Sequence, residues 1–287
     1  MVRVFPVMKQ VLKLDCMKNK TAIITGGATG LGKKMAEHYA ANDINTIICS
    51  RNTERLKNTA DEINSKYGNK VSHFRVDVAD LNSIENFFLY LSLKKIKPDI
   101  LINNAAGNFI SKTEDLSPNA VNKIIDIVLK GSLNMTMKFS EKLIKEDRPG
   151  TILSISTLYA DTGSGFVVPS AIAKSGINAM TKSLASEWGK YGIRTLAVAP
   201  GSIYTEGAFS RLDPTGEFKK RLLSVNPSGR LGEREELANF ITFLTSDYCS
   251  WVNGQVINFD GGEGNFRAGQ MNELNALPDS FWKSIKK

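Results

Sequence analysis

The chain carries a glycine-rich turn near its start, Thr25-Gly26-Gly27-Ala28-Thr29-Gly30-Leu31-Gly32, between a short apolar run and a stretch of helical character. A strand, a tight turn and a helix N-terminus together bind anions, because the first N–H groups of the helix point at the ligand. Glycines allow the tight turn and the close approach of a pyrophosphate. This pattern predicts a dinucleotide site rather than an ordinary glycine-rich loop. Its contacts would come from Gly26, Gly27, Ala28, Thr29, Gly30 and Leu31.

The end of the second apolar run indicates which dinucleotide binds. An NAD site usually places Asp or Glu there to hold the ribose 2′-hydroxyl. Here Ser50 stands at that position and Arg51 follows. A guanidinium suits a 2′-phosphate, which it can hold through two charge-assisted hydrogen bonds. We therefore predict NADPH/NADP as the cofactor, against the alternative that Arg51 is a surface arginine.

Three further segments follow apolar runs and offer polar or small groups. Asp77 could accept a hydrogen bond from the adenine amino group, or it could be a turn or helix-cap residue. The run Asn103-Asn104-Ala105-Ala106-Gly107 has small residues that would let a cofactor approach. Backbone groups of a fourth segment could hold the nicotinamide amide, and its residues are Pro200, Gly201, Ser202 and Ile203.

Apolar strand-like runs that alternate with helical stretches must position these residues. Several runs are unbroken, as expected of parallel strands covered on both faces. The alternation implies βαβ units with right-handed crossovers. We predict an α/β fold with a single-domain, Rossmann-like, doubly wound parallel sheet of about seven strands and helices on both faces. The predicted strands are Thr21–Thr25, Thr46–Ser50, Val71–Val76, Ile100–Asn104, Thr151–Ser156, Arg194–Ala199 and Gln255–Phe259.

Composition excludes several other classes of protein. The net charge is +8, but no basic run with interleaved aromatic residues predicts a nucleic-acid site. No run of about 18 apolar residues predicts a membrane span. With only His38 and His73, neither a His-rich metal site nor a Ser-His-Asp hydrolase is supported, and no metal is predicted. Three scattered cysteines favour a reducing compartment.

The organisation of the chain is predicted in three parts: an N-terminal arm over residues 1–19, a catalytic domain over residues 20–262, and a C-terminal extension over residues 263–287. The basic and apolar N-terminal segment is either an arm or the remnant of a processed presequence. Two long periodic stretches, Ser117–Lys145 and Ser170–Lys190, predict long helices. Such helices often pair between subunits, so we expect a homo-oligomer.

The set of motifs resembles the short-chain dehydrogenase/reductase family from about Lys20 to Gly262. The motifs are TGxxxGxG, NNAAG, a lysine on the second long helix, PG and the run Asp260-Gly261-Gly262. That family normally carries a tyrosine four residues before its lysine, where this chain has Ser170 before Lys174. The helix asparagine of the family is replaced by Val128.

These departures resemble the 2,4-dienoyl-CoA reductases within the family. The matching runs are residues 104–110, Leu158-Tyr159-Ala160, residues 163–170, and residues 207–216, which resemble the mitochondrial type. The resemblance implies an acyl-CoA substrate, a role in fatty-acid β-oxidation, a tetramer and the mitochondrial matrix, with a cytoplasmic or peroxisomal location as the alternatives. The family's arginine two residues after the third-strand aspartate is absent, since Ala79 stands there.

The resemblance also implies residue roles. Tyr159 stands in for the missing helix tyrosine, and with Asn108 it would donate hydrogen bonds to the thioester carbonyl. Lys174 would hold the nicotinamide ribose, and Ser170, one helical turn away, would support the polar network. The acyl-CoA path would be lined by Arg51, Asn108, Phe109, Ser117, Tyr159 and Arg211. Considered without the resemblance, Tyr159 is a half-buried loop aromatic, Asn108 a turn residue and Arg211 a surface charge.

The implied reaction is a conjugate reduction. Hydride adds to C5 of the 2,4-dienoyl thioester, and negative charge spreads onto the thioester oxygen, where two donors would stabilise it. Protonation at C2, by water or by Tyr159, gives a trans-3-enoyl-CoA. Two alternatives stay open: another NADP-dependent carbonyl or enoyl reductase of the family, and a non-catalytic NADP-binding protein. A carbonyl reductase would need tyrosine in place of Ser170.

Overall fold

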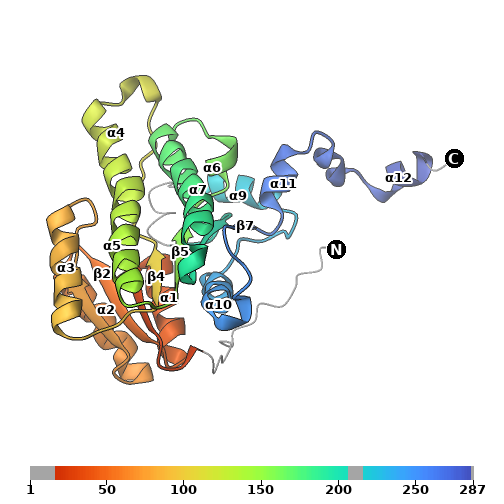
Figure 1. Ribbon diagram of the computed structural model, residues 1–287. Coiled ribbons are helices and arrows are strands. Elements are labelled where there is room, and N and C mark those ends of the chain that lie inside the picture. Colours follow the sequence, from red (N-terminus) through yellow and green to blue (C-terminus); the bar gives the residue numbers. More distant parts are fainter. Residues whose placement is uncertain (1–16, 206–215, 286–287) are drawn as a thin grey trace.

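The computed structural model describes residues 17–205 and 216–285 of the chain. These residues form one seven-stranded sheet in the order β3-β2-β1-β4-β5-β6-β7, and every neighbouring pair is parallel (Figure 1). The strands are β1 Thr21–Thr25, β2 Asn45–Ser50, β3 Val71–Arg75, β4 Ile100–Asn103, β5 Gly150–Ile155, β6 Ile193–Pro200 and β7 Val256–Phe259.

The predicted fold class is confirmed, and each predicted strand coincides with an observed one to within one residue at either end. The central strands are buried along almost their whole length. Burial on both faces explains why their sequences are unbroken apolar runs.

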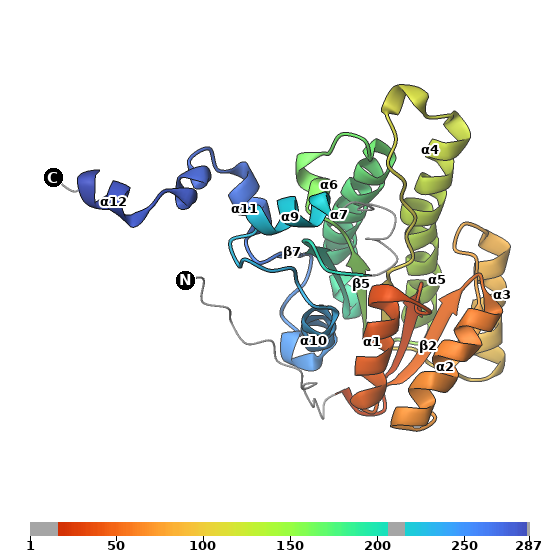
Figure 2. The ribbon, with the colours of Figure 1, turned by 180° about the vertical axis from the view of Figure 1, so that it is seen from behind.

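Helices cover both faces of the sheet (Figures 1 and 2). One face carries α1, α2 and α10, whose apolar side chains form one core cluster with the sheet, and the other carries α3, α5 and α7. The helices are α1 Gly30–Ala41, α2 Thr53–Tyr67, α3 Leu81–Leu93, α4 Pro118–Ile125, α5 Gly131–Lys145, α6 Tyr159–Thr162, α7 Val168–Trp188, α9 Glu217–Ser224, α10 Arg234–Thr245, α11 Glu263–Ala268 and α12 Asp279–Ile285.

The first predicted long helix is not uniform. Between α4 and α5 the chain stays helical but adopts a π-helical turn, η3, over Asp126–Lys130. Val128, which occupies the family's asparagine position, lies buried in this turn. A Cβ added to Gly176 of α7 would lie 2.8 Å from Leu129 Cδ1, so glycine allows this turn to pack closely on α7. The second long helix is α7, which begins two residues earlier than predicted and ends at Trp188.

The N-terminal end of the described chain packs into the core, whereas the C-terminal end extends away from it. Met17, within the predicted N-terminal arm, is fully buried in the core. After β7, the chain passes through α11 and the short 3₁₀ helix η6, Asn272–Ala276, to α12, which reaches away from the body (Figures 1 and 2). Among the described residues, no helix has the length and apolar character needed to cross a membrane.

Candidate active site

The predicted cofactor residues follow the carboxyl ends of β1, β2, β3 and β6, and these ends lie along one edge of the parallel sheet. The strand order reverses at β1, which pairs with β2 on one side and β4 on the other. In open α/β sheets, ligands bind in the crevice at such a switch point. The topology therefore brings the glycine turn after β1 next to Asn104 and its neighbours after β4.

The glycine turn is locked to the end of β4 by two polar side chains. Thr25 Oγ1 accepts hydrogen bonds from the backbone N–H groups of Asn104 and Ala105, both at 3.0 Å. Asn104 Nδ2 in turn donates to the carbonyl oxygens of Thr25, at 2.9 Å, and Gly26, at 3.3 Å. These bonds hold the glycine turn against the end of β4.

Two glycines of the turn have no room for a side chain. A Cβ on Gly32 would lie 2.3 Å from the carbonyl oxygen of Gly26, and one on Gly27 would lie 2.7 Å from Ile48 Cγ2. Gly26 and Gly30 have φ values of +66° and +54°, a region that favours glycine. At Gly30 no atom beyond the adjoining residues and the backbone of its own helix lies within 4 Å of the added Cβ position, so this side of the backbone is open to a ligand. A bare backbone ahead of the N-terminus of α1 fits a dinucleotide pyrophosphate.

The other predicted cofactor residues occupy simple structural positions. Arg51 is exposed directly after β2, and Asn52 beside it caps α2, its side chain accepting from Arg55 N at 2.8 Å. Asp77 is half-buried after β3, and its Oδ1 accepts from Ala79 N at 3.1 Å. Asp77 thus has the turn role that was the alternative to adenine binding, and its contact with a cofactor stays a prediction.

The buried side chain of Glu263 holds the predicted nicotinamide loop. Glu263, only 4 % exposed, accepts a hydrogen bond from Ser202 N at 2.9 Å and pairs with Arg267 at 3.0 Å. Gly201 donates to the Phe259 carbonyl at 3.0 Å, and a Cβ there would meet Asp260 Cβ at 2.7 Å. Sequence reasoning missed this contact of Glu263 with the loop, although Glu263 directly follows the Asp-Gly-Gly motif.

The structure brings together three of the four predicted catalytic side chains through hydrogen bonds. The Tyr159 hydroxyl lies 3.1 Å from Ser170 Oγ and 3.5 Å from Asn108 Nδ2. Asn108 Oδ1 accepts from Phe109 N at 2.9 Å, which turns its Nδ2 toward the tyrosine. Ser170 is buried, Tyr159 half-buried and Asn108 exposed, so the cluster runs from the protein interior to solvent.

Lys174 lies one turn after Ser170 on α7 and is 7 % exposed. Its Nζ donates to the carbonyl oxygen of Ile155, at the end of β5. Burial disfavours the charged form and lowers the pKa of Lys174 to about 8. The ammonium is thus held against the end of β5, and it can lose a proton in the mildly alkaline range.

An apolar cluster adjoins the polar one. Phe109 packs against a small core of Ile124, Val128 and Ala173, contributed by α4, η3 and α7. Ser117, predicted on the acyl-CoA path, caps α4 by accepting from Ala120 N at 3.2 Å. Arg211 lies outside the described residues.

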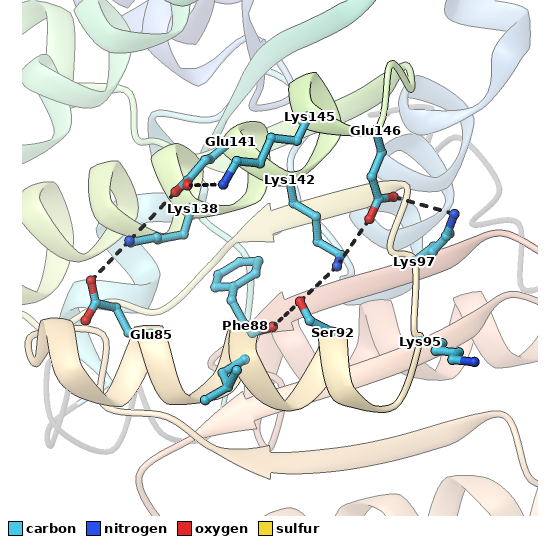
Figure 3. A pocket seen from close by; sticks show the side chains of 11 residues that line it. Glu85, Phe88, Ser92, Lys95, Lys97, Lys138, Glu141, Lys142, Lys145 and Glu146 are labelled. Atoms are coloured by element: carbon cyan, nitrogen blue, oxygen red, sulfur yellow. Dashed lines mark hydrogen bonds and ion pairs between the residues drawn. The ribbon is translucent and has the colours of Figure 1, made fainter.

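A separate groove of about 700 Å³ lies between α3 and α5 (Figure 3). None of its lining residues belongs to the predicted site. Lysines and glutamates pair within it: Lys138 pairs with Glu85 at 3.1 Å, Lys145 with Glu141 at 3.2 Å, and Lys142 with Glu146 at 3.3 Å. Because its glutamates pair with these lysines, we assign no ligand to this groove.

Comparison of the sequence with models of known protein families identifies the family of this chain. A family model described as enoyl-(acyl carrier protein) reductase matches residues 26–263. The chain belongs to the short-chain dehydrogenase/reductase family and is an oxidoreductase. Among solved structures, a short-chain dehydrogenase from Bacillus anthracis has a TM-score of 0.80 and 37 % identity, covering 88 % of this chain and 99 % of that one.

Relatives with curated names narrow the resemblance. A Caenorhabditis elegans protein named uncharacterized oxidoreductase F53C11.3 is 49 % identical over 92 % of this chain and 86 % of its own. Another C. elegans protein, named probable 2,4-dienoyl-CoA reductase 3, is 44 % identical over 92 % of this chain and 87 % of its own. The rat peroxisomal 2,4-dienoyl-CoA reductase is 34 % identical, covering 86 % of this chain and 85 % of its own.

A structural neighbour carries a bound cofactor. It is described as a putative 2-deoxy-D-gluconate 3-dehydrogenase from Agrobacterium tumefaciens with bound NADP. Its TM-score is 0.79 at 30 % identity, and the match covers 86 % of this chain and 97 % of that one.

Proposed function

We propose that this oxidoreductase reduces 2,4-dienoyl-CoA thioesters to trans-3-enoyl-CoA with NADPH, as an auxiliary step in the β-oxidation of unsaturated fatty acids. The observation that carries the proposal is the meeting of Tyr159 with Asn108 and Ser170. Ser170 occupies the family's tyrosine position on α7, yet a phenol hydroxyl reaches the same place from α6. The names of several relatives point to the same activity.

When bound, NADPH supplies the hydride for the conjugate reduction. Asn108 Nδ2 and the Tyr159 hydroxyl would both donate to the thioester oxygen. Ser170 Oγ, 3.1 Å from the Tyr159 hydroxyl, fixes where that hydroxyl lies. These donors stabilise the oxygen more strongly once it becomes an oxyanion, so they lower the barrier rather than only binding substrate. The Tyr159 hydroxyl, or water, would give the proton to C2.

The preference for NADPH rests on Arg51. The position before it is Ser50, so no carboxylate there would repel a 2′-phosphate or hold a 2′-hydroxyl. Arg51 is exposed and available to a charged ligand. The structural neighbour with bound NADP supports the proposal.

The main alternative is a carbonyl reductase of the same family. It would use a phenol carried on the long helix, whereas this chain places Ser170 there. The second alternative, a non-catalytic NADP-binding protein, is disfavoured by the membership of an oxidoreductase family.

The proposal is tested by following oxidation of NADPH and NADH with three substrates: a 2,4-dienoyl-CoA, a 2-enoyl-CoA and a simple ketone. We expect turnover with the dienoyl-CoA and NADPH, and a 3-enoyl product by nuclear magnetic resonance. Turnover of the ketone alone would favour the carbonyl reductase. Cofactor binding without turnover of any substrate would favour the non-catalytic protein.

We also propose that the chain forms a homotetramer in the mitochondrial matrix. Met137 of α5 and Ile172 of α7 are 53 % and 55 % exposed, and pairing of these helices between subunits would cover both side chains. Light scattering tests the assembly, and a monomer in solution would contradict it. Because the rat relative is named as peroxisomal, fractionation must compare both organelles.

A further inference from the structure

The face of α7 that carries Ser170 and Lys174 extends by one more turn to Asn178. The three residues are spaced by four, so they lie on one side of the helix. Ser170 meets the Tyr159 hydroxyl and Lys174 meets the end of β5. We infer that Asn178 is a positioning residue, whose amide holds the α6 turn and thereby aims the Tyr159 hydroxyl into the site.

The amide of Asn178 makes two hydrogen bonds in opposite directions. Its Oδ1 accepts from Ser156 Oγ at 2.6 Å, and its Nδ2 donates to Asp161 Oδ1 at 3.0 Å. Asn178 and Ser156 are 3 % and 4 % exposed. An ionised carboxylate can only accept, so the NH₂ group must face Asp161 and the oxygen must face Ser156. One amide therefore ties down the chain three residues before Tyr159 and two residues after it.

The α6 turn needs such support. It contains four residues, and its N-cap, Leu158, offers no side-chain hydrogen bond. An isolated helix of this length is unstable, because few hydrogen bonds offset the cost of nucleation. The exposed run from Gly163 to Phe166 follows directly. Apart from Asn178, Ser175 Oγ of α7 also holds the turn by donating to the carbonyl oxygen of Ala160.

This inference rests on the proposed function for its kinetic test but not for its structural one. In Asn178→Ala we expect faster amide hydrogen exchange in the α6 turn, where Gly163 N donates to the Tyr159 carbonyl at 3.0 Å. Thr181→Val is the matched control, since Thr181 is a buried α7 residue whose hydroxyl donates only to Ile177 O, at 2.9 Å, within the helix. Unchanged exchange in Asn178→Ala, with the chain folded, would overturn the inference whether or not the chain reduces a dienoyl-CoA.

The kinetic test exchanges the donor and the acceptor of the hydrogen bond between Asn178 and Asp161. Asn178→Asp sets two carboxylates against each other and should lower kcat roughly 10- to 100-fold, the scale of a misplaced catalytic group. Adding Asp161→Asn restores a donor and an acceptor with their positions exchanged, and should recover most of the activity. In a Tyr159→Phe background, Asn178→Ala should cause little further loss, since the hydroxyl that it aims is absent.

Two results would contradict the positioning role: failure of the exchanged pair to recover activity although it folds, or a full additional loss in the Tyr159→Phe background. Absence of turnover in the parent protein would instead refute the proposed function, and hydrogen exchange would then decide the inference alone.

Discussion

The hydroxyl of Tyr159 lies 3.1 Å from Ser170 Oγ although their backbones belong to different helices. Ser170 is the residue four before Lys174, where the family ordinarily carries its tyrosine. The site thus keeps a phenol near the lysine-bearing face of α7 but supplies it from α6. Under the proposed function, this relationship gives a chain without the usual helix tyrosine a phenol donor in the site.

Ser170→Ala removes one of the hydrogen-bond partners of the Tyr159 hydroxyl. We expect kcat to fall by a factor of about two to ten, because a typical hydrogen bond contributes about 0.5–1.5 kcal/mol. Ser132→Ala is the control, since Ser132 is also a buried helix serine but belongs to α5, and its hydroxyl donates to Val128 O at 2.7 Å. Steady-state kinetics on both variants decide the point, and equal losses would show a general effect of helix stability.

Gly30→Ala tests whether the turn binds a pyrophosphate. Gly30 and Gly68 both have positive φ, +54° and +76°, and open space where a Cβ would lie. Both alanines should therefore lower folding stability through backbone strain, and Gly68→Ala by more, because its φ of +76° and ψ of 176° are almost confined to glycine. Only Gly30→Ala should weaken NADPH binding by calorimetry, because its methyl group occupies space that the ligand needs. Equal NADPH affinity in the two variants would argue against this position for the pyrophosphate.

Arg51→Ala tests cofactor choice. The parent protein should bind NADPH more tightly than NADH, and the variant should lose roughly 1.5–3 kcal/mol of NADPH affinity, the scale of a charge-assisted hydrogen bond. NADH affinity should hardly change. Lys57→Ala, on the exposed side of α2, removes the same charge and should leave both affinities intact. Equal parental affinity for the two cofactors would refute the prediction.

Lys174 gives the site a pH dependence. Its pKa is lowered by burial to about 8, so the free enzyme loses the ammonium as the pH rises past that value. We expect kcat/KM for NADPH to fall above about pH 8 and this limb to vanish, at a low rate, in Lys174→Ala. Lys182→Ala, an exposed lysine on the same helix, should keep the parental profile.

The lowered pKa of Lys174 affects folding stability in the direction opposite to its effect on kcat/KM: stability rises with pH. Between about pH 8 and the ordinary value of 10.5, the unfolded chain binds more protons at Lys174 than the folded chain. Unfolding then takes up a proton, so this residue makes folding more favourable as the pH rises. Denaturant unfolding across that range should show a smaller rise in Lys174→Ala than in the parent. An identical slope in both would contradict the lowered pKa.

The strands could be predicted closely because parallel strands buried on both faces leave unbroken apolar runs, as in Ile100–Asn103. The π-helical turn at Asp126–Lys130 could not, because its residues keep a helical pattern and only the packing on α7 distinguishes it. Met17 was likewise assigned to the N-terminal arm, although its side chain is fully buried in the core. A single apolar residue in a basic segment carries no periodic signal.

The candidate site likewise has residues that the sequence pattern predicts and residues that it does not. The glycine turn can be predicted from the sequence, because tight backbone packing requires glycine at Gly26, Gly27 and Gly32. Tyr159 and Asn108 were found only through the resemblance, since one tyrosine and one asparagine in loops have no distinguishing pattern. Asn178 was missed, yet its spacing of four from Lys174 was visible. Its two partners, Ser156 and Asp161, became evident only in three dimensions.

The central claim, that Tyr159 is the catalytic tyrosine, is tested most directly by the kinetics of Tyr159→Phe on a 2,4-dienoyl-CoA with saturating NADPH. The substitution keeps the ring and removes only the hydroxyl. We expect kcat to fall about 10²- to 10³-fold with a much smaller change in substrate binding, because the lost hydrogen bond is strongest in the transition state. Asn108→Ala should act in the same direction, and the double variant should be less than additive. A near-parental kcat in Tyr159→Phe would contradict the assignment.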